Sequence, residues 1–463
     1  MHQHDLIVLG GGTGNIVASA AADAGLDVAI VEEDRLGGTC LNRGCNPSKK
    51  LIHRADVVET VRRANSLGID ASVDGIAFED IIETVNASIE GAAAAKGERA
   101  RNRENVTFYQ TTGRFVDERT IEVDHSEEAK ELRGEKIVIA GGSRPSIPNS
   151  IDGTADVRYL TSADALRLTE RPDRLVIVGG GYIAVEMGHF FGTMGTDVSI
   201  VGRSDLLVDG EDRDIARRLT AAYAESHDLS LGYEATALGI VGDAKIVRAE
   251  SEDGEQIEIE GDEVLLATGR RPNTDRWNVE AAGVEMDERG FVRTNEYLET
   301  SVDGVWAIGD IAGNYLFKHS GDKEAEYVVE NAIRENRRAV EYPGMAHAVF
   351  GSPQVASLGR TESAIESETD SYEVGTFRYD DTALGTVLQE DTGFAKVIVD
   401  EEEVLGFHLI GPHASMLIHE VSTAVAAGAD PETIAETIHV HPALSEVVQG
   451  AFRDVRSVAP TGF

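Results

Sequence analysis

The sequence predicts an α/β protein that contains two βαβ folds and a third domain of α+β type. Two glycine-rich loops, at residues 10–14 and 179–184, each lie between a short apolar run and a segment with helical character. A second strand-like run follows each helix, and this order is typical of a parallel βαβ unit. Beyond Pro343 strands and helices alternate without glycine loops, which indicates a separate domain.

The first unit begins with the apolar run at residues 5–9, which is typical of a buried parallel strand. An alanine-rich helix is expected over residues 16–24, where Gly25 ends it, and a second strand over 28–31. The second unit repeats this order, with its segments at residues 174–178, 182–194 and 197–201.

The rest of the chain divides around these two units. A helix is predicted at about residues 78–103 and a strand at 136–140, and the turn-rich segment 141–152 marks a domain boundary. We therefore expect a discontinuous first domain that consists of residues 1–150 and 273–342. The second domain is expected at residues 151–272 and the third at residues 343–463.

The charge balance is strongly acidic, with 82 Asp and Glu against 42 Lys and Arg and a net charge of −40. The acids are spread along the chain, so we expect no binding to nucleic acid or to anionic membranes, which would repel them. No apolar run approaches the length of about 20 residues that spans a bilayer. We expect a soluble, cytoplasmic protein adapted to high salt, where screening weakens self-repulsion. An ordinary acidic protein is the alternative.

The first glycine loop has the spacing of a dinucleotide-binding site. Gly10 permits a tight turn, Gly12 lets backbone amides approach a pyrophosphate, and Glu32 follows where a carboxylate can bind a ribose hydroxyl. Asn15 stands where a third Gly or Ala is usual, directly after Gly14. A glycine-rich turn without a ligand is the alternative interpretation.

In the second loop Gly179 and Gly181 have the same positions, with Ala184 as the small third residue. Gly202 and Arg203 follow the second strand in place of an acid. Because an arginine can pair with a 2′-phosphate that a carboxylate would repel, we predict NADPH over NADH. A solvated Arg203 without a ligand is the alternative.

The two cysteines of the chain, Cys40 and Cys45, follow the first unit directly. No second pair of cysteines completes a metal site, so we expect no metal. A pair at this spacing closes easily into a disulfide, and beside a flavin one thiolate can donate charge to the ring while the other attacks a substrate disulfide. Two buried, unreactive cysteines are the alternative.

The segment from Gly37 to Lys49 resembles the active-site segment of the pyridine nucleotide–disulfide oxidoreductases, which include glutathione reductase, dihydrolipoamide dehydrogenase, mercuric reductase and mycothione reductase. The resemblance extends in order over nearly the whole chain, through residues 181–186, 268–274, 307–310 and 439–446. It implies a glutathione reductase-like fold, with a Rossmann-like FAD domain, a Rossmann-like NADPH domain and a dimerisation domain.

The resemblance also implies roles for individual residues. Cys40 would be the interchange thiol, Cys45 the charge-transfer thiol, and His441 the acid–base, held by Glu446 and acting on the other subunit of an obligate homodimer. His439 is the alternative to His441. Lys49 and Glu186 would form an ion pair near the flavin, and Tyr182 would cover the flavin until nicotinamide arrives. The FAD-binding residues would be Gly10, Gly12, Gly14, Glu32, Thr39, Lys49, Gly113 and Asp310, and the NADPH-binding residues Gly179, Gly181, Tyr182, Arg203 and Gly269.

The disulfide substrate is narrowed by what the sequence lacks. Gly202 stands where dihydrolipoamide dehydrogenases carry an acid, which argues against lipoamide. The C-terminal tail lacks the cysteines that mercuric reductases and large thioredoxin reductases need. Ala20–Ala22 replace the basic residues with which glutathione reductases hold glutathione. Residues 14–15, 316–319 and 349–354 resemble mycothione reductase. The acidic composition suggests a salt-loving archaeon, where γ-glutamylcysteine is the thiol, so we expect bis-γ-glutamylcystine as the substrate. The alternatives are a dihydrolipoamide dehydrogenase, a reductase of mycothione or glutathione disulfide, and a flavoprotein scaffold without activity.

Overall fold

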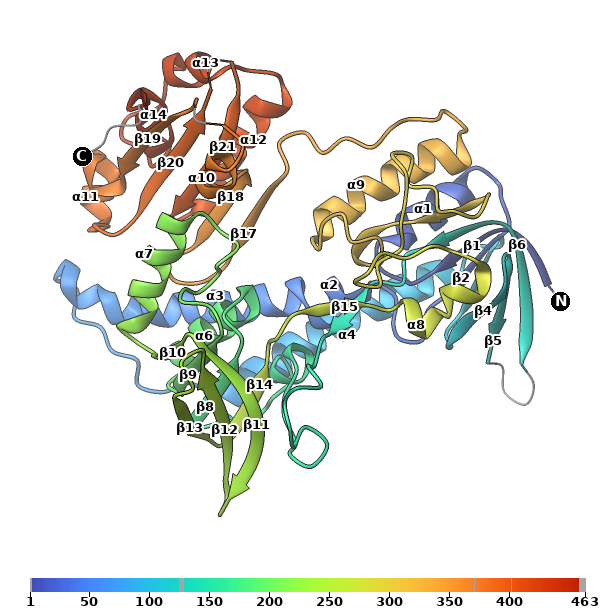
Figure 1. Cartoon of the computed structure of the whole chain (residues 1–463), viewed down its shortest axis with the longest axis horizontal. Coiled ribbons are helices and arrows are strands. Elements are labelled where there is room, and N and C mark those ends of the chain that lie inside the picture. Colours follow the sequence, from blue (N-terminus) through green and yellow to red (C-terminus); the bar gives the residue numbers. More distant parts are fainter. Residues whose placement is uncertain (1, 125–128, 370, 401, 458–463) are drawn as a thin grey trace.

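The structure is a computed structural model that describes residues 2–124, 129–369, 371–400 and 402–457 (Figure 1). Its first sheet has the order β3-β2-β1-β6-β5-β4, with β16 paired to the other side of β6. Four of its pairings are parallel, and β4, β5 and β6 form an antiparallel meander. The strands are β1 (His2–Leu9), β2 (Val28–Val31), β3 (Val106–Tyr109), β4 (Gly113–Asp117), β5 (Thr120–Val123), β6 (Lys130–Ile139) and β16 (Val305–Ala307).

Helices cover this sheet and extend from it. The helix α1 (Gly14–Asp23) packs its small buried residues Val17, Ala18 and Ala21 in one core with Ala325 of α9 (Lys318–Val328). A short helix and two long ones, α2 (Gly38–Arg43), α3 (Cys45–Arg63) and α4 (Phe78–Arg101), lead from the first sheet toward the second (Figure 1). The sequence therefore placed the start of α4 correctly and its end two residues too late.

The second sheet is parallel, with the order β10-β9-β8-β14. Its helix α6 is buried along most of its length, and α7 carries an apolar face of Ile215, Leu219 and Tyr223. A three-stranded antiparallel sheet, β11-β12-β13, packs beside it. The elements are β8 (Arg174–Val178), α6 (Tyr182–Thr193), β9 (Asp197–Gly202), α7 (Arg213–Ala224), β10 (Asp228–Leu231), β11 (Tyr233–Val241), β12 (Ala244–Ser251), β13 (Gln256–Gly261) and β14 (Glu263–Leu266).

Two short strands join the first two sheets. The strands β7 (Ser143–Pro145) and β15 (Arg270–Pro272) pair antiparallel, so the chain leaves and re-enters the first region side by side. Strand β7 lies inside the segment that the sequence predicts to be turns, because its partner lies more than 120 residues later and gives no local signal. The domain boundaries at residues 150, 272 and 342 stay predictions.

The third sheet is antiparallel throughout, with the order β17-β18-β21-β20-β19-β22. Helices α12 and α14 pack on it through Ile418, Val421, Val447 and Phe452. Its elements are β17 (Ala346–Val349), β18 (Val355–Gly359), β19 (Glu373–Arg378), β20 (Phe394–Val399), β21 (Val404–Ile410), β22 (Arg456–Ser457), α12 (Ala414–Ala426), α13 (Pro431–Glu436) and α14 (Glu446–Arg453). The remaining short helices are α5 (Ser162–Ala165), α8 (Thr274–Trp277), α10 (Glu362–Glu366) and α11 (Ala383–Leu388).

A mixed sheet with a parallel core and a second, fully parallel sheet, each with crossover helices, are followed by an antiparallel sheet with its own helices, which confirms the predicted fold class. No helix within the described residues is both long and apolar enough to cross a membrane.

Candidate active site

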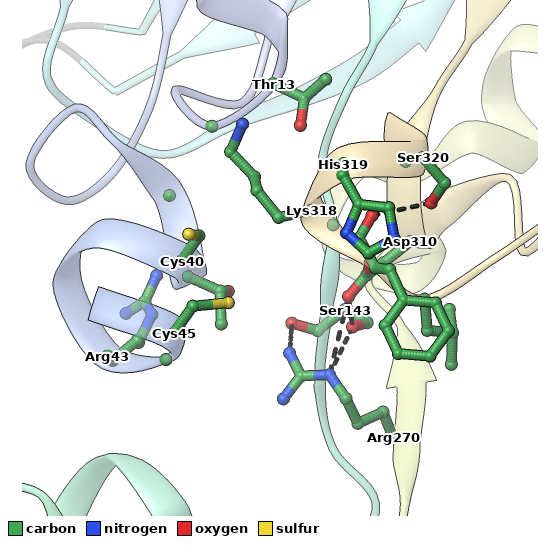
Figure 2. A pocket seen from close by; sticks show the side chains of 18 of the residues that line it. Thr13, Cys40, Arg43, Cys45, Ser143, Arg270, Asp310, Lys318, His319 and Ser320 are labelled. Atoms are coloured by element: carbon green, nitrogen blue, oxygen red, sulfur yellow. Dashed lines mark hydrogen bonds and ion pairs between the residues drawn. The ribbon is translucent and has the colours of Figure 1, made fainter. Parts of the chain in front are cut away.

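A single large cavity of about 2060 Å³ collects most of the residues that the sequence analysis selects. It runs from the first glycine loop past the two cysteines to the N-terminus of α6 and the start of the third sheet. Figure 2 shows part of its wall, with the cysteines on one side and Asp310, Ser143 and Arg270 facing them across the space. Of the predicted residues, those lining the cavity are Gly12, Glu32, Thr39, Cys40, Cys45, Lys49, Gly113, Gly181, Tyr182, Glu186, Gly269 and Asp310.

The first glycine loop has the geometry that a dinucleotide requires. Gly10 has a φ of +104°, and a Cβ there would collide with the carbonyl oxygen of Ala140. Gly12 faces the Cα of Gly38 with no side chain between them, which leaves the backbone before α1 open to a pyrophosphate. Glu32, 8 % exposed, accepts hydrogen bonds from the backbone N–H groups of Gly11 (2.7 Å) and Asp34 (3.0 Å).

Asp310 lies in the turn after β16 and also lines this cavity. The hydroxyl of Ser143 donates a hydrogen bond to its carboxylate, and Arg270 lies 3.6 Å from the same carboxylate. Arg270 also donates to the Ser143 hydroxyl from Nε (2.8 Å), so β7 and β15 hold Asp310 toward the cavity (Figure 2). The glycine loop, Glu32 and Asp310 together fit a long dinucleotide cofactor.

The two cysteines are free thiols placed by a break between two helices. Cys40 lies in α2, Gly44 interrupts the helix, and Cys45 is the first residue of the 19-residue α3. The hydrogen bond from Cys40 lowers the pKa of Cys45 to about 6; burial opposes this shift and the charge of Lys49 supports it. The hydrogen bond to Cys45 raises the pKa of Cys40, as does burial. When the pair holds one proton, these opposite shifts favour Cys40 as the thiol and Cys45 as the thiolate.

This proton sharing predicts a pH dependence. In the reduced protein, alkylation of Cys45 by iodoacetamide should rise with pH around a midpoint of about 6, because the thiolate is the reactive form. Peptide mapping by mass spectrometry gives the rate at each cysteine. Replacing Cys40 with Ala removes the donor and should move the midpoint upward. A midpoint near the ordinary thiol value of about 8.5 in the unsubstituted protein would contradict the geometry.

Lys49 and Glu186 form an ion pair between α3 and α6. The Lys49 Nζ lies 2.6 and 2.7 Å from the two carboxylate oxygens of Glu186 and 4.5 Å from the centre of the Phe350 ring. The backbone N–H of Phe350 also donates to Glu186 at 3.3 Å. Because Lys49 lies one turn along α3 from Cys45, this pair brings a fixed positive charge close to the thiolate.

The second glycine loop repeats the geometry of the first. Gly179 has a φ of +121°, and a Cβ at this position would collide with the carbonyl oxygen of Ala267. The same relation holds between Gly10 and Ala140 in the first loop. Tyr182 begins α6 directly after this loop, and its ring stacks on Phe317 and His347. Arg203 lies just after β9 and is exposed.

His441 and Glu446 lie away from the cavity of their own chain. The Nδ1 of His441 is 2.9 Å from Glu446 Oε1, and Glu446 also accepts from the backbone N–H of Ala443 (2.9 Å). The His441 side chain is 71 % exposed. Among the residues that the structure describes, those lining the cavity include neither His441 nor Glu446. The alternative, His439, is 6 % exposed and is bonded to Glu420, so its imidazole is less available for proton transfer.

One cluster has donors spaced for a metal ion, although the sequence predicts none. Potential ligand atoms of Asp56, Glu59 and His189 lie within 4.8 Å of one another. His189 Nε2 is 2.9 Å from Asp56 Oδ1, and both oxygens of Glu59 accept from Ser352 at 2.9 Å. The donors are thus paired without a metal.

Sequence reasoning missed residues that complete the site from distant segments. They are Ser143 and Arg270 at Asp310, Phe350 at the ion pair, and Phe317, His347 and Glu211 around Tyr182. Arg270 lies inside the segment 268–274 that resembles the family, so the sequence could have indicated it. Phe317 and Phe350 lie inside the segments 316–319 and 349–354, whose resemblance gave these side chains no role. Ser143, His347 and Glu211 lie outside the motifs, and only the folded chain brings them to the site.

The chain belongs to the pyridine nucleotide–disulphide oxidoreductases, whose family model matches residues 4–336, while the family's dimerisation domain matches residues 345–452. It is a flavoprotein disulfide oxidoreductase, and this family uses FAD and NAD(P)H. The predictions of family, enzyme class and cofactor class are confirmed.

Similar proteins carry different names. "Dihydrolipoyl dehydrogenase 3" of Haloarcula marismortui is 34% identical, covering 98% of this chain and 97% of the relative. "Mycothione reductase" of Mycobacterium tuberculosis is 33% identical, covering 98% and 100%. A solved Cu(II) complex of the HOCl-induced flavoprotein disulfide reductase RclA from Escherichia coli has a TM-score of 0.87 at 26% identity, covering 98% and 99%.

Proposed function

We propose that this enzyme is an NADPH-dependent reductase of a low-molecular-weight disulfide, with bis-γ-glutamylcystine as its substrate. The observation that carries the disulfide chemistry is the pair of free cysteines, Cys40 and Cys45, which line one cavity with Lys49 and Glu186. Gly12, Glu32 and Asp310 would hold FAD in this cavity, and the bound flavin would supply the two electrons that reduce the cysteine pair. The remaining steps belong to side chains of the protein.

The chemistry follows from the proton that the pair shares. Cys40 loses its proton to the partner subunit's His441 and attacks one sulfur of the substrate, which forms a mixed disulfide and breaks the substrate S–S bond. The departing thiolate takes the proton back from this imidazole. The Cys45 thiolate then attacks Cys40, which releases the second thiolate and forms the Cys40–Cys45 disulfide. Reduction of that disulfide by one hydride equivalent, which NADPH would supply, returns one thiol and one thiolate for the next turnover.

The proposed acid–base role of His441 requires a homodimer. The dimerisation domain matches residues 345–452, and His441 is exposed in the single chain. Near it lie large apolar side chains that a partner would cover: Ile438 is 96 % exposed and Val440 is 76 % exposed. A second copy of the chain that covers this surface would bring its His441 to the cysteines.

Arg203 should set the dinucleotide preference. Replacing it with Ala removes a cation placed for the 2′-phosphate, so the KM for NADPH should rise about tenfold or more, while the KM for NADH stays unchanged. Steady-state kinetics with both dinucleotides measure this. Arg217→Ala removes another exposed cation of the same region and is the control. An equal effect on both dinucleotides would show that Arg203 does not contact the phosphate.

Three observations support bis-γ-glutamylcystine. The helix α1 carries no basic side chain to hold a glycyl carboxylate, which this disulfide lacks. Several of the similar proteins come from haloarchaea. The net charge of −40 suits a cell interior rich in salt. A cytoplasmic location and a requirement for salt stay predictions, and full stability in dilute buffer would count against the second.

The names of the haloarchaeal relatives favour a second function, dihydrolipoamide dehydrogenase. Both directions can be assayed on one preparation in concentrated salt: disulfide-dependent oxidation of NADPH, and NAD⁺ reduction by dihydrolipoamide. The proposed function requires the first reaction to be faster. A faster second reaction would assign the chain to the dehydrogenases.

A further inference from the structure

A buried carboxylate lies behind Tyr182 without a role in the chemistry described so far. Glu211 lies in the segment between β9 and α7 and is 5 % exposed. The hydroxyl of Tyr182 donates a hydrogen bond to its Oε1, which also lies 2.8 Å from the Nε2 of His347. The hydroxyl of Ser357 donates to Oε2. Three partners from three parts of the chain thus converge on one carboxylate.

Two of these partners belong to the third sheet. His347 lies in β17 and Ser357 in β18, whereas Tyr182 begins α6 beside the second glycine loop. The neighbouring Asp212 is fixed in the same way, because Lys396 of β20 lies 2.8 Å from its carboxylate in a buried cluster. The third sheet therefore fixes this segment at two neighbouring residues, Glu211 and Asp212.

The charge state of this group is set by its partners. Burial acts to raise the pKa of Glu211, but the hydrogen bond and charge of His347, with the hydroxyls of Ser357 and Tyr182, outweigh it and lower the pKa. Burial and the charge of Glu211 raise the pKa of Tyr182. Tyr182 is therefore a neutral donor to an ionised acceptor, and hydrogen bonds of this kind are stronger than neutral ones.

Tyr182 is also held by its ring. It stacks on His347 at 6.0 Å and on Phe317 at 6.1 Å between ring centres, and all three residues line the cavity. Tyr182 directly follows the second glycine loop, in the cavity that Lys49 and the two cysteines also line. The ring can move aside only if the stack opens and the hydroxyl leaves Glu211.

We propose that Glu211 is the positioning residue that holds Tyr182 closed across the nicotinamide site, and that the third sheet holds Glu211 through His347 and Ser357. The inference rests on the proposed use of a pyridine dinucleotide. Its consequence is that dinucleotide binding includes the cost of breaking the Tyr182–Glu211 hydrogen bond, since only the open fraction of the protein is competent to bind.

A double-mutant cycle tests this coupling. The dissociation constant of NADP⁺ is measured by calorimetry on the FAD-loaded protein in concentrated salt, for Tyr182→Phe, Glu211→Gln and the double variant. Each single change should lower the dissociation constant by about tenfold, because the closed state loses a charge-assisted hydrogen bond. The double variant should bind no more tightly than either single variant, since both remove the same interaction.

A matched control removes a comparable hydrogen bond elsewhere. The Tyr372 hydroxyl donates to Glu362 at 3.2 Å and to Glu366 at 3.1 Å outside the cavity, so Tyr372→Phe should leave the dissociation constant unchanged. Unchanged or weaker NADP⁺ binding in Tyr182→Phe, or additive effects in the double variant, would overturn the inference, even if thermal stability falls. A complete lack of NADP⁺ binding by the unsubstituted protein would overturn the proposed function as well.

Discussion

Replacing Cys40 with Ser should reduce disulfide-dependent NADPH consumption by about 10³-fold or more, because the hydroxyl cannot act as the nucleophile. NADPH should still bleach the flavin absorbance of this variant in the absence of oxygen, since Cys40 acts after the dinucleotide. The serine hydroxyl can still donate to Cys45, so the Cys45 thiolate should survive. Stopped-flow absorbance and steady-state assays on one preparation measure both reactions.

Cys45→Ser is the matched control. This variant should also lose disulfide reduction. Because it lacks the Cys45 thiolate as well, the alkylation with a midpoint near pH 6 should disappear. Retention of substantial disulfide reduction by Cys40→Ser would show that Cys40 is not the attacking thiol.

Replacing His441 with Gln should lower turnover by about 10²–10⁴-fold, the usual loss for a general acid–base, with little change in NADPH binding. Because His441 is proposed to act across the dimer, purified heterodimers of one Cys40→Ser subunit and one His441→Gln subunit contain one intact site. Such heterodimers should recover about half of the activity of the unsubstituted dimer.

His439→Gln is the control for a general effect on this segment, and it should retain turnover because its imidazole is already bonded to Glu420. Two purified subunits that carry different affinity tags allow the heterodimer to be isolated. Heterodimers as inactive as either parent would show that Cys40 and His441 do not act across subunits.

The sequence predicted the parts of the fold that have local signals. The glycine loops at Gly10 and Gly179 marked both parallel units, because a tight turn with positive φ is available almost only to glycine. The helix that begins at Phe78 was predicted with its correct start. Strands β7 and β15 were not found, because each has three residues and exists only through its partner.

The residues of the candidate site could also be predicted only where they lie close together in the sequence. Cys40, Cys45, Lys49 and the first glycine loop lie close together in the sequence, so their spacing could be interpreted directly. Glu211 could not be found from the sequence, because Tyr182, His347 and Ser357 lie 29, 136 and 146 residues away from it. If His441 acts across the dimer, as we propose, its position relative to the cysteines depends on a second chain, and neither spacing nor the fold of one chain determines it.

The most direct test of the proposed function compares four disulfides as acceptors of electrons from NADPH in concentrated salt: bis-γ-glutamylcystine, glutathione disulfide, mycothiol disulfide and lipoamide. The quantity to compare is kcat/KM for each. We predict the highest value for bis-γ-glutamylcystine, since α1 lacks a basic clamp and Arg203 is proposed to favour NADPH. The highest value for lipoamide, with NADH preferred over NADPH, would contradict this assignment and identify a dihydrolipoamide dehydrogenase.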